Sequence, residues 1–233
     1  MYYPMYYRFD PTYLLIIVGV LLSMAASAKL NATYQRYAAV RSRSGLTGAQ
    51  VAQEILRSQG IYDVTVRRVS GRLTDHYDPR TKTVNLSDAV YGESSIAAIG
   101  VAAHECGHAI QDANSYAPLR MRAALVPVAN FGATLSWPLI LFGLIMGGGP
   151  LITVGILLFS LAVLFQIVTL PVEYNASGRA VRLLDSIGIL YGEEVGQARR
   201  VLNAAALTYV AAAAGSILQL LRLVILFGNR RED

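Results

Sequence analysis

The feature that most limits the fold of this chain is a run of fifty residues, Ala123 to Val172, without a single Asp, Glu, Lys, Arg or His. One helical crossing of a bilayer needs only about 20 apolar residues. The run is interrupted near its middle by GGGP, Gly147 to Pro150, and this composition is typical of a turn. The sequence therefore predicts two membrane helices, at about 125–146 and 151–171, joined by a tight hairpin.

Two further segments extend this membrane pattern. Pro11 to Ala28 is also free of charge, and we expect it to remain as an anchor because no strong small-residue cleavage site follows it. The segment from Ala204 is long enough for another helix, but Arg222 lies in its last third, so it either spans, lies in the interface or packs on the polar domain. Charged residues make up only 15% of the chain, against roughly 25% in soluble domains. We expect a multi-pass protein of the cell membrane with three to four transmembrane helices.

The distribution of basic residues predicts the orientation in the membrane. Twelve Lys and Arg residues lie between Lys29 and Arg122, whereas one, Arg8, precedes the first span and none lies in the hairpin turn. By the positive-inside rule, the polar domain and its active site face the cytoplasm. The net charge of +5 is then explained by anionic headgroups. The lipid bilayer is the expected partner and nucleic acid is not, while no feature of the sequence sets the oligomeric state.

The polar segment predicts a small α+β unit of about 90 residues. A helix should begin at Thr47, where Gln50 completes a capping pattern, and should stop at Gly60. The strings VTVRRV, RLTDHY and KTVNLS then alternate and are separated by SG and DPRT, which favours a short antiparallel meander. A second helix over 94–112 would complete the unit.

This second helix carries AAHECGHAIQ, residues 102 to 111, with two of the three histidines in the chain. Four helical residues advance roughly 400° and about 6 Å, so His104 and His108 share one face. Two imidazoles suit zinc, and a catalytic zinc takes three protein ligands and keeps one open position for water. Glu105, offset by about 100°, would reach that water as general base. We expect one Zn²⁺ per chain; the alternative is a pair of core histidines with a surface glutamate.

Small and apolar residues around the motif predict that this helix is buried and closely approached by another element. They recur at three- and four-residue steps, at Ile96, Ile99, Gly100, Ala103 and Gly107. Cys106 is the only cysteine, so no internal disulfide is possible, and we interpret it as a packing residue rather than a redox group.

Glu173 is the best candidate for the third ligand. It lies in LPVEYNASGRA, directly after the uncharged run, where a helix can restart after Pro171. Two crossings return the chain to the side it left, so Glu173 and the histidines share a compartment. The alternative is an interfacial carboxylate that marks the end of a span. The predicted segments are a tail and first span, a polar catalytic part, a membrane hairpin, a ligand-bearing helix and a probable fourth span, at 1–28, 29–122, 123–172, 173–203 and 204–233.

The order of an H-E-x-x-H helix, a membrane hairpin and a glutamate opening a second helix resembles the gluzincin membrane proteases of the HtpX and CAAX prenyl protease type. The strings DHYDP, VNLS, AAHECGHAIQ and LPVEYNASGRA are similar to those of the YugP-type zinc metallopeptidases, over nearly the whole chain. The resemblance implies a membrane α-helical protein with a small α+β gluzincin-like catalytic domain, which hydrolyses peptide bonds of membrane proteins or peptides. It implies His104, His108 and Glu173 as ligands and Glu105 as base.

One position departs from the family pattern. The wider gluzincin group has an aspartate four residues after the ligand glutamate, and this chain has Ser177 there. A metal-bound histidine usually needs a hydrogen-bond acceptor for its other ring nitrogen. Either Ser177, Asn175 or a carboxylate elsewhere takes this part, or the site is less activated than those of its relatives.

The strand before the metal helix forms, by the same resemblance, an active-site edge to which an extended peptide adds. TDHYDP occupies that place, so His76 or Tyr77 would stabilise the oxyanion of the reaction. The alternatives for His76 are an ordinary polar residue beside a turn, or a third ligand in place of Glu173. A rival function is a non-catalytic membrane scaffold stabilised by metal, but such a site favours four protein ligands and no free base. A different metal serving another hydrolysis is a third possibility.

Overall fold

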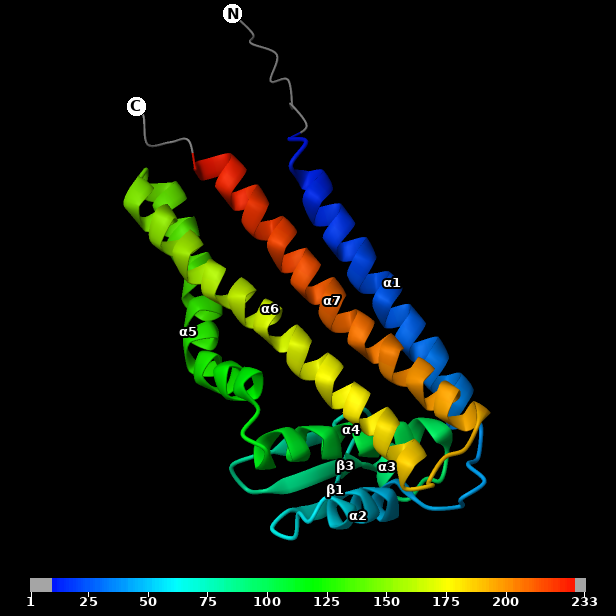
Figure 1. The fold of residues 1–233 in the computed structure, drawn as a ribbon. Helices are drawn as coiled ribbons and strands as arrows, with labels where there is room; N and C mark the ends of the chain where they lie inside the picture. The colour runs from blue at the N-terminus through cyan, green and yellow to red at the C-terminus, as the bar shows by residue number, and fades with distance from the viewer. Residues whose placement is uncertain (1–9, 229–233) are drawn as a thin grey trace, which may run out of the picture.

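Four long helices stand on a smaller unit of short helices and strands in this computed structural model, which describes residues 10–228 (Figure 1). Within that range, four helices are long and apolar enough to cross a membrane. They are α1 (Tyr13–Ala38), α5 (Ala117–Met146), α6 (Gly149–Ser186) and α7 (Glu193–Phe227). The predicted set of long apolar helices is therefore confirmed, and the segment from Ala204 belongs to one of them. The N-terminal tail with Arg8, and the last five residues, lie outside the described range.

The course of α6 differs from the prediction at Pro171. The helix does not end and restart there but continues to Ser186, so Glu173 lies inside α6. A proline removes one backbone hydrogen bond, and a helix that packs on several neighbours tolerates this loss. Because α6 is continuous, Glu173 lies on the same helix that forms the second half of the apolar hairpin.

The hairpin between α5 and α6 is confirmed. Gly147 ends α5 in the left-handed conformation, with φ of 66°, which glycine adopts without steric cost. The two helices then pack closely through glycines. A Cβ added at Gly155 would lie 2.6 Å from the Ile140 side chain, and one at Gly132 would lie 2.6 Å from the carbonyl oxygen of Leu158. Small residues at such contacts let membrane helices approach backbone to backbone.

The sheet has three strands, β1 (Thr65–Val69), β2 (His76–Asp78) and β3 (Thr83–Ser87), in the order β1-β3-β2. The antiparallel hairpin of β2 and β3 around the DPRT turn is confirmed. The predicted meander is wrong for β1, which runs parallel to β3. As a result, β2 is an edge strand.

The connection between β1 and β2 explains this topology. Instead of forming a hairpin turn at SG, the chain crosses the end of β3 and is tied there by two aspartates. Asp88 accepts from Arg68 Nε at 2.6 Å and from the Gly71 backbone at 3.3 Å. Asp75 accepts from the backbone N–H of Ser87 at 2.7 Å and from its hydroxyl. These side-chain bonds replace the β1–β2 pairing that alternation alone would favour.

Three helices complete the small unit: α2 (Gly48–Ser58), α3 (Asp88–Tyr91) and α4 (Ile96–Ala113). The capping box of Thr47 and Gln50 at the start of α2 is confirmed. Most of α4 is buried, and it packs against α2, the sheet and α6. Cys106 is fully buried with Sγ 3.5 Å from the carbonyl oxygen of Ala52, and burial raises the pKa of its thiol. This environment agrees with a packing role.

Candidate metal centre

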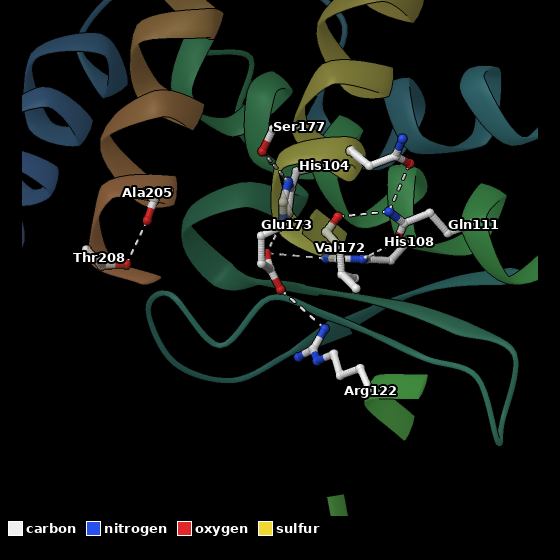
Figure 2. Close-up of polar contacts among 10 residues, drawn as sticks. His104, His108, Gln111, Arg122, Val172, Glu173, Ser177, Ala205 and Thr208 are labelled. Atoms are coloured by element: carbon white, nitrogen blue, oxygen red, sulfur yellow. Dashed lines mark hydrogen bonds and ion pairs between the residues drawn. The ribbon is translucent and has the colours of Figure 1, made fainter. Parts of the chain in front are cut away.

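The centre is built where α4 and α6 cross. A Cβ added at Gly107 would lie 2.6 Å from the carbonyl oxygen of Ala176, so only glycine permits this contact without a shift. The close approach expected at Gly107 is therefore confirmed. It brings Glu173, one turn before Ala176 on α6, over the histidines of α4 (Figure 2).

Three donor atoms converge at this crossing. Glu173 Oε2 lies 3.2 Å from His104 Nε2 and 3.7 Å from His108 Nε2, and the ligand atoms of these residues all lie within 4.8 Å of one another. Two ligand atoms bound at about 2.0–2.1 Å to a tetrahedral zinc ion are roughly 3.3 Å apart. The two distances to Glu173 Oε2 are close to this value, and two imidazoles with a carboxylate are a donor set that suits zinc.

The buried carboxylate supports the same reading. Glu173 is 2% exposed, and its Oε2 has no hydrogen-bond partner within residues 10–228. An unpaired buried polar atom destabilises a fold, and the cost is larger for a charged group. A cation held by Oε2 and the two imidazoles would supply the missing partner.

The other ring nitrogen of each histidine has its own partner. Nδ1 of His104 lies 3.1 Å from Ser177 Oγ, and Nδ1 of His108 lies 3.0 Å from Gln111 Oε1. When Nδ1 donates to these oxygens, the lone pair of Nε2 is left for a metal. Ser177 therefore takes the part that an aspartate has in the wider gluzincin group. The hydrogen-bond partners of the two histidines, Ser177 and Gln111, are both uncharged.

Gln111 is fixed by two further bonds. Its Nε2 donates to the carbonyl oxygen of Val172 at 2.8 Å and to Asn175 Oδ1 at 3.0 Å, so Oε1 must face His108. The side chain is fully buried. Sequence reasoning did not single out Gln111, although its position three residues after His108 places it on the same helix face.

Arg122 was also missed. It lies in α5 and its Nη1 is 3.2 Å from Glu173 Oε1, the oxygen that does not face the histidines. The guanidinium therefore offsets the charge of the buried carboxylate and leaves Oε2 for a metal (Figure 2). The available signal was its place as the last charge before the fifty-residue uncharged run.

Charges around His108 act on its pKa in opposite directions. Burial lowers the pKa of His108, whereas the contact with Glu173 and the negative charges of Glu105 and Glu173 raise it. The raising effects together are larger, so the net shift of the pKa is upward. The pocket is thus one that favours positive charge. Because a ligating imidazole must be neutral, a metal would supply this charge in place of a proton.

A cavity of about 280 Å³ opens beside the donor atoms. Glu105, 7% exposed, lines it together with the two histidines and Glu173. The rest of its wall comes from the β2 region, from the first turns of α5 and from α7: Asp75, His76, Tyr77, Pro79, Leu119, Arg122, Ala123, Val126 and Tyr209. The residue predicted as base therefore shares a solvent-accessible space with the predicted ligands.

His76 lies in this wall but outside the donor group, which in residues 10–228 comprises His104, His108 and Glu173. Its Nδ1 lies 2.9 Å from the carbonyl oxygen of Thr74 and its Nε2 lies 3.2 Å from Asn85 Nδ2. The geometry thus favours Glu173 over His76 as third ligand, and a catalytic role for His76 stays a prediction.

Tyr77, the other candidate on β2 for stabilising the oxyanion, has its hydroxyl bonded to a residue of α4. Its hydroxyl donates to Asp112 Oδ2 at 2.8 Å, and the same oxygen accepts from Lys82 at 2.7 Å. Burial, and then the bond to Asp112, raise the pKa of the Tyr77 phenol. The tyrosine therefore ties β2 to the end of α4.

Comparison with known proteins agrees with this geometry. Residues 12–228 match a family model described as "Putative neutral zinc metallopeptidase". The chain is also 47% identical over 219 residues to the "Putative membrane protease YugP" of Bacillus subtilis strain 168, covering 94% of this chain and 97% of that protein. No solved structure gives a significant match. Because the family model and this relative both span nearly the whole chain, the protein belongs to this family of zinc metallopeptidases and is a membrane protein.

Proposed function

We propose that this protein uses one zinc ion to hydrolyse peptide bonds of membrane proteins or peptides at the cytoplasmic face of the membrane. The observation that carries the proposal is the meeting of three donor atoms and Glu105 in one cavity, which is lined in part by three of the four apolar helices, α5, α6 and α7. The ligands are His104, His108 and Glu173.

The residues divide the chemistry between them. Zinc held by His104, His108 and Glu173 would polarise the scissile carbonyl and lower the pKa of a bound water. Glu105 takes the proton from the attacking water and passes it to the leaving amine. Ser177 and Gln111 hold the imidazoles in the orientation that ligation needs, through their bonds to Nδ1.

The surroundings of the cavity support a peptide as substrate. Within residues 10–228, β2 is an edge strand that pairs on one side only, with β3, and an extended peptide can add to such an edge through main-chain hydrogen bonds. This is the arrangement that the resemblance to gluzincins implies. In the same cavity, Leu119, Ala123 and Val126 of α5 contribute an apolar wall that suits an apolar substrate side chain. His76, the first residue of this edge strand and part of the cavity wall, would contact the substrate.

The rival function, a metal-stabilised scaffold, fits these features less well. A structural zinc site normally has four protein ligands, whereas the donor group in the described chain has three members. Glu105 lines an accessible cavity beside that group, and a purely structural metal site does not require such a free base.

Replacing Glu105 with Gln tests the catalytic proposal. The amide keeps the shape but cannot accept the proton, so turnover should fall by about 10²–10⁴-fold while zinc content stays at one per chain. The measurement is cleavage of a membrane-anchored peptide by the full chain in lipid vesicles. Glu54→Gln, on the exposed face of α2, is the matched control. Turnover of Glu105→Gln within a few-fold of the parent would remove Glu105 from the mechanism.

Cysteine labelling tests the orientation, which rests on the basic residues between α1 and α5. In a Cys106→Ala background, a cysteine at Gly148, in the hairpin turn, should react with a membrane-impermeant thiol reagent outside intact cells. One at Ser70, beside the sheet, should not react. The opposite pattern would place the active site outside the cytoplasm.

A further inference from the structure

A second cleft, of about 530 Å³, lies between α1 and α7 and is separate from the metal centre. Lys29, Thr33 and Arg36 line it from α1, at steps of four and three residues that place them on one helix face. Arg200 and Asn203 line it from α7, with Leu207 one turn further along. We call this cleft the basic groove.

The basic groove has cations without matching anions. Its lining contains no Asp or Glu, and no salt bridge of the described chain involves its three basic side chains. Glu193 acts on Arg200 from outside the lining. The groove thus concentrates positive potential, which favours an anionic ligand.

Buried Tyr37 gives the groove a defined shape. Its hydroxyl accepts from Arg200 Nη1 at 3.1 Å, and Arg36 lies over its ring at 5.5 Å from the centroid. Tyr37 itself is 4% exposed. Arg200 is therefore held at the hydroxyl of one buried phenol and Arg36 over its ring, and both guanidinium groups keep N–H groups for a ligand.

The groove lies at the level where both helices enter their apolar runs. On α1 the uncharged run ends at Ala28, immediately before Lys29, and on α7 the next uncharged run begins at Val201, immediately after Arg200. Lys29 and Arg36 are separated by about 10 Å along the helix, which is enough to span the roughly 5–8 Å depth of the headgroup layer on each side of a bilayer. Figure 1 shows α1 and α7 side by side over this length.

We propose that the basic groove binds the phosphate-bearing headgroup of an anionic phospholipid. Arg36 and Arg200 would contact the phosphate, Lys29 would reach it from the deeper end, and Leu207 would meet the start of the acyl chains. Basic pockets between membrane helices recognise such headgroups. A lipid bound here would link α1 to α7 at their polar ends.

Native mass spectrometry of the full chain in detergent tests this proposal, with phosphatidylglycerol and phosphatidylcholine as probes. The parent should retain one phosphatidylglycerol per chain in preference to phosphatidylcholine. At about fivefold for each basic residue near a membrane surface, the Lys29→Gln/Arg36→Gln/Arg200→Gln variant should bind roughly 100-fold more weakly. The charge-matched control is Arg57→Gln/Arg182→Gln/Arg199→Gln, at exposed positions outside the groove, which should bind within about twofold of the parent.

Further arms separate the alternatives. If the groove variant loses zinc as well as lipid, the single Lys29→Gln change, at an exposed side chain, should still weaken phosphatidylglycerol binding about fivefold. The charge-conserving variant Lys29→Arg/Arg36→Lys/Arg200→Lys should preserve phosphatidylglycerol binding. Equal retention of the two lipids, equal loss in the control variant, or full displacement by millimolar inorganic phosphate would each overturn the proposal.

Discussion

Both halves of α6 pack closely against another helix at a glycine, but the two contacts serve different purposes. In its first half, Gly155 allows contact with α5, where an added Cβ would lie 2.6 Å from Ile140. In its second half, α6 contacts α4 at Gly107, where an added Cβ would lie 2.6 Å from Ala176. The first contact lies within the uncharged run, whereas the second is flanked by Glu173, whose Oε2 lies 3.2 Å from His104 Nε2, and by Ser177, whose Oγ lies 3.1 Å from His104 Nδ1.

This difference shows what close approach does and does not specify. Between α5 and α6, packing of small and apolar groups holds two membrane helices together. This packing does not require a polar atom to point at one particular position. Between α4 and α6, each donor atom must lie within a few tenths of an ångström of its productive place. The buried hydrogen bonds of Gln111 and Ser177 supply this direction, because a satisfied polar network specifies one arrangement.

The largest effect should come from Gly107→Ala. The new methyl group must push α6 away from α4, so the zinc affinity should fall by at least about 100-fold, with overpacking costing roughly 1–3 kcal/mol of stability. Zinc titration and thermal unfolding of the purified protein measure both quantities.

Two glycine variants on α6 sharpen this test. Gly155→Ala should lower stability but leave zinc affinity within a few-fold, since its contacts are with α5. Gly178→Ala, with nothing within 4 Å of the added Cβ, should change neither. Equal zinc affinity in Gly107→Ala and Gly178→Ala would show that the crossing does not position the donors.

An intermediate effect is expected for Gln111→Glu. A carboxylate still accepts from His108 but cannot donate to the Val172 carbonyl or to Asn175 Oδ1, so the tie between α4 and α6 is lost. Zinc affinity should fall by about 10–100-fold, as for other groups that orient metal ligands. Gln53→Glu, exposed on α2, is the matched control. Unchanged or tighter binding by Gln111→Glu would mean that only the bond to His108 matters.

The smallest effect should come from Ser177→Ala. It removes one neutral acceptor from His104, and zinc affinity should fall by about tenfold. Ser177→Asp, which restores the residue of the wider family, should recover the loss. The readout is competition with a chromophoric chelator, and binding by Ser177→Ala equal to the parent would exclude Ser177 as an orienting group.

Hydropathy and spacing predict most of this structure because both act locally. Charge-free runs predict α1, α5 and α6 as spans and leave the course of the segment from Ala204 open, and the shared face of His104 and His108 follows from helix geometry. Glu173 could be chosen because few carboxylates follow the motif and two crossings return it to the same side. Gly107 could be expected at a close contact because small residues recur around it.

The features that sequence reasoning missed depend on tertiary contacts. The parallel pairing of β1 is set by aspartates that bond across the end of β3, and no local pattern reveals which strand they meet. Pro171 favoured a break in α6, yet neighbouring helices support the continuous rod. The bonds of Gln111 to α6 and of Arg122 to Glu173 join segments more than fifty residues apart.

The central claim is that Glu173 completes a three-ligand zinc site with His104 and His108. Isothermal titration of the metal-free protein with zinc tests it most directly, comparing the parent with Glu173→Gln and with Glu194→Gln. Glu194 is a buried glutamate outside the metal centre, and its Oε1 accepts from the backbone N–H of Arg43. We expect about one zinc per parent chain, a loss of at least roughly 100-fold in affinity for Glu173→Gln, since two imidazoles leave zinc underligated, and parental affinity for Glu194→Gln. Equal affinity of the parent and Glu173→Gln would contradict the account and require a different third ligand.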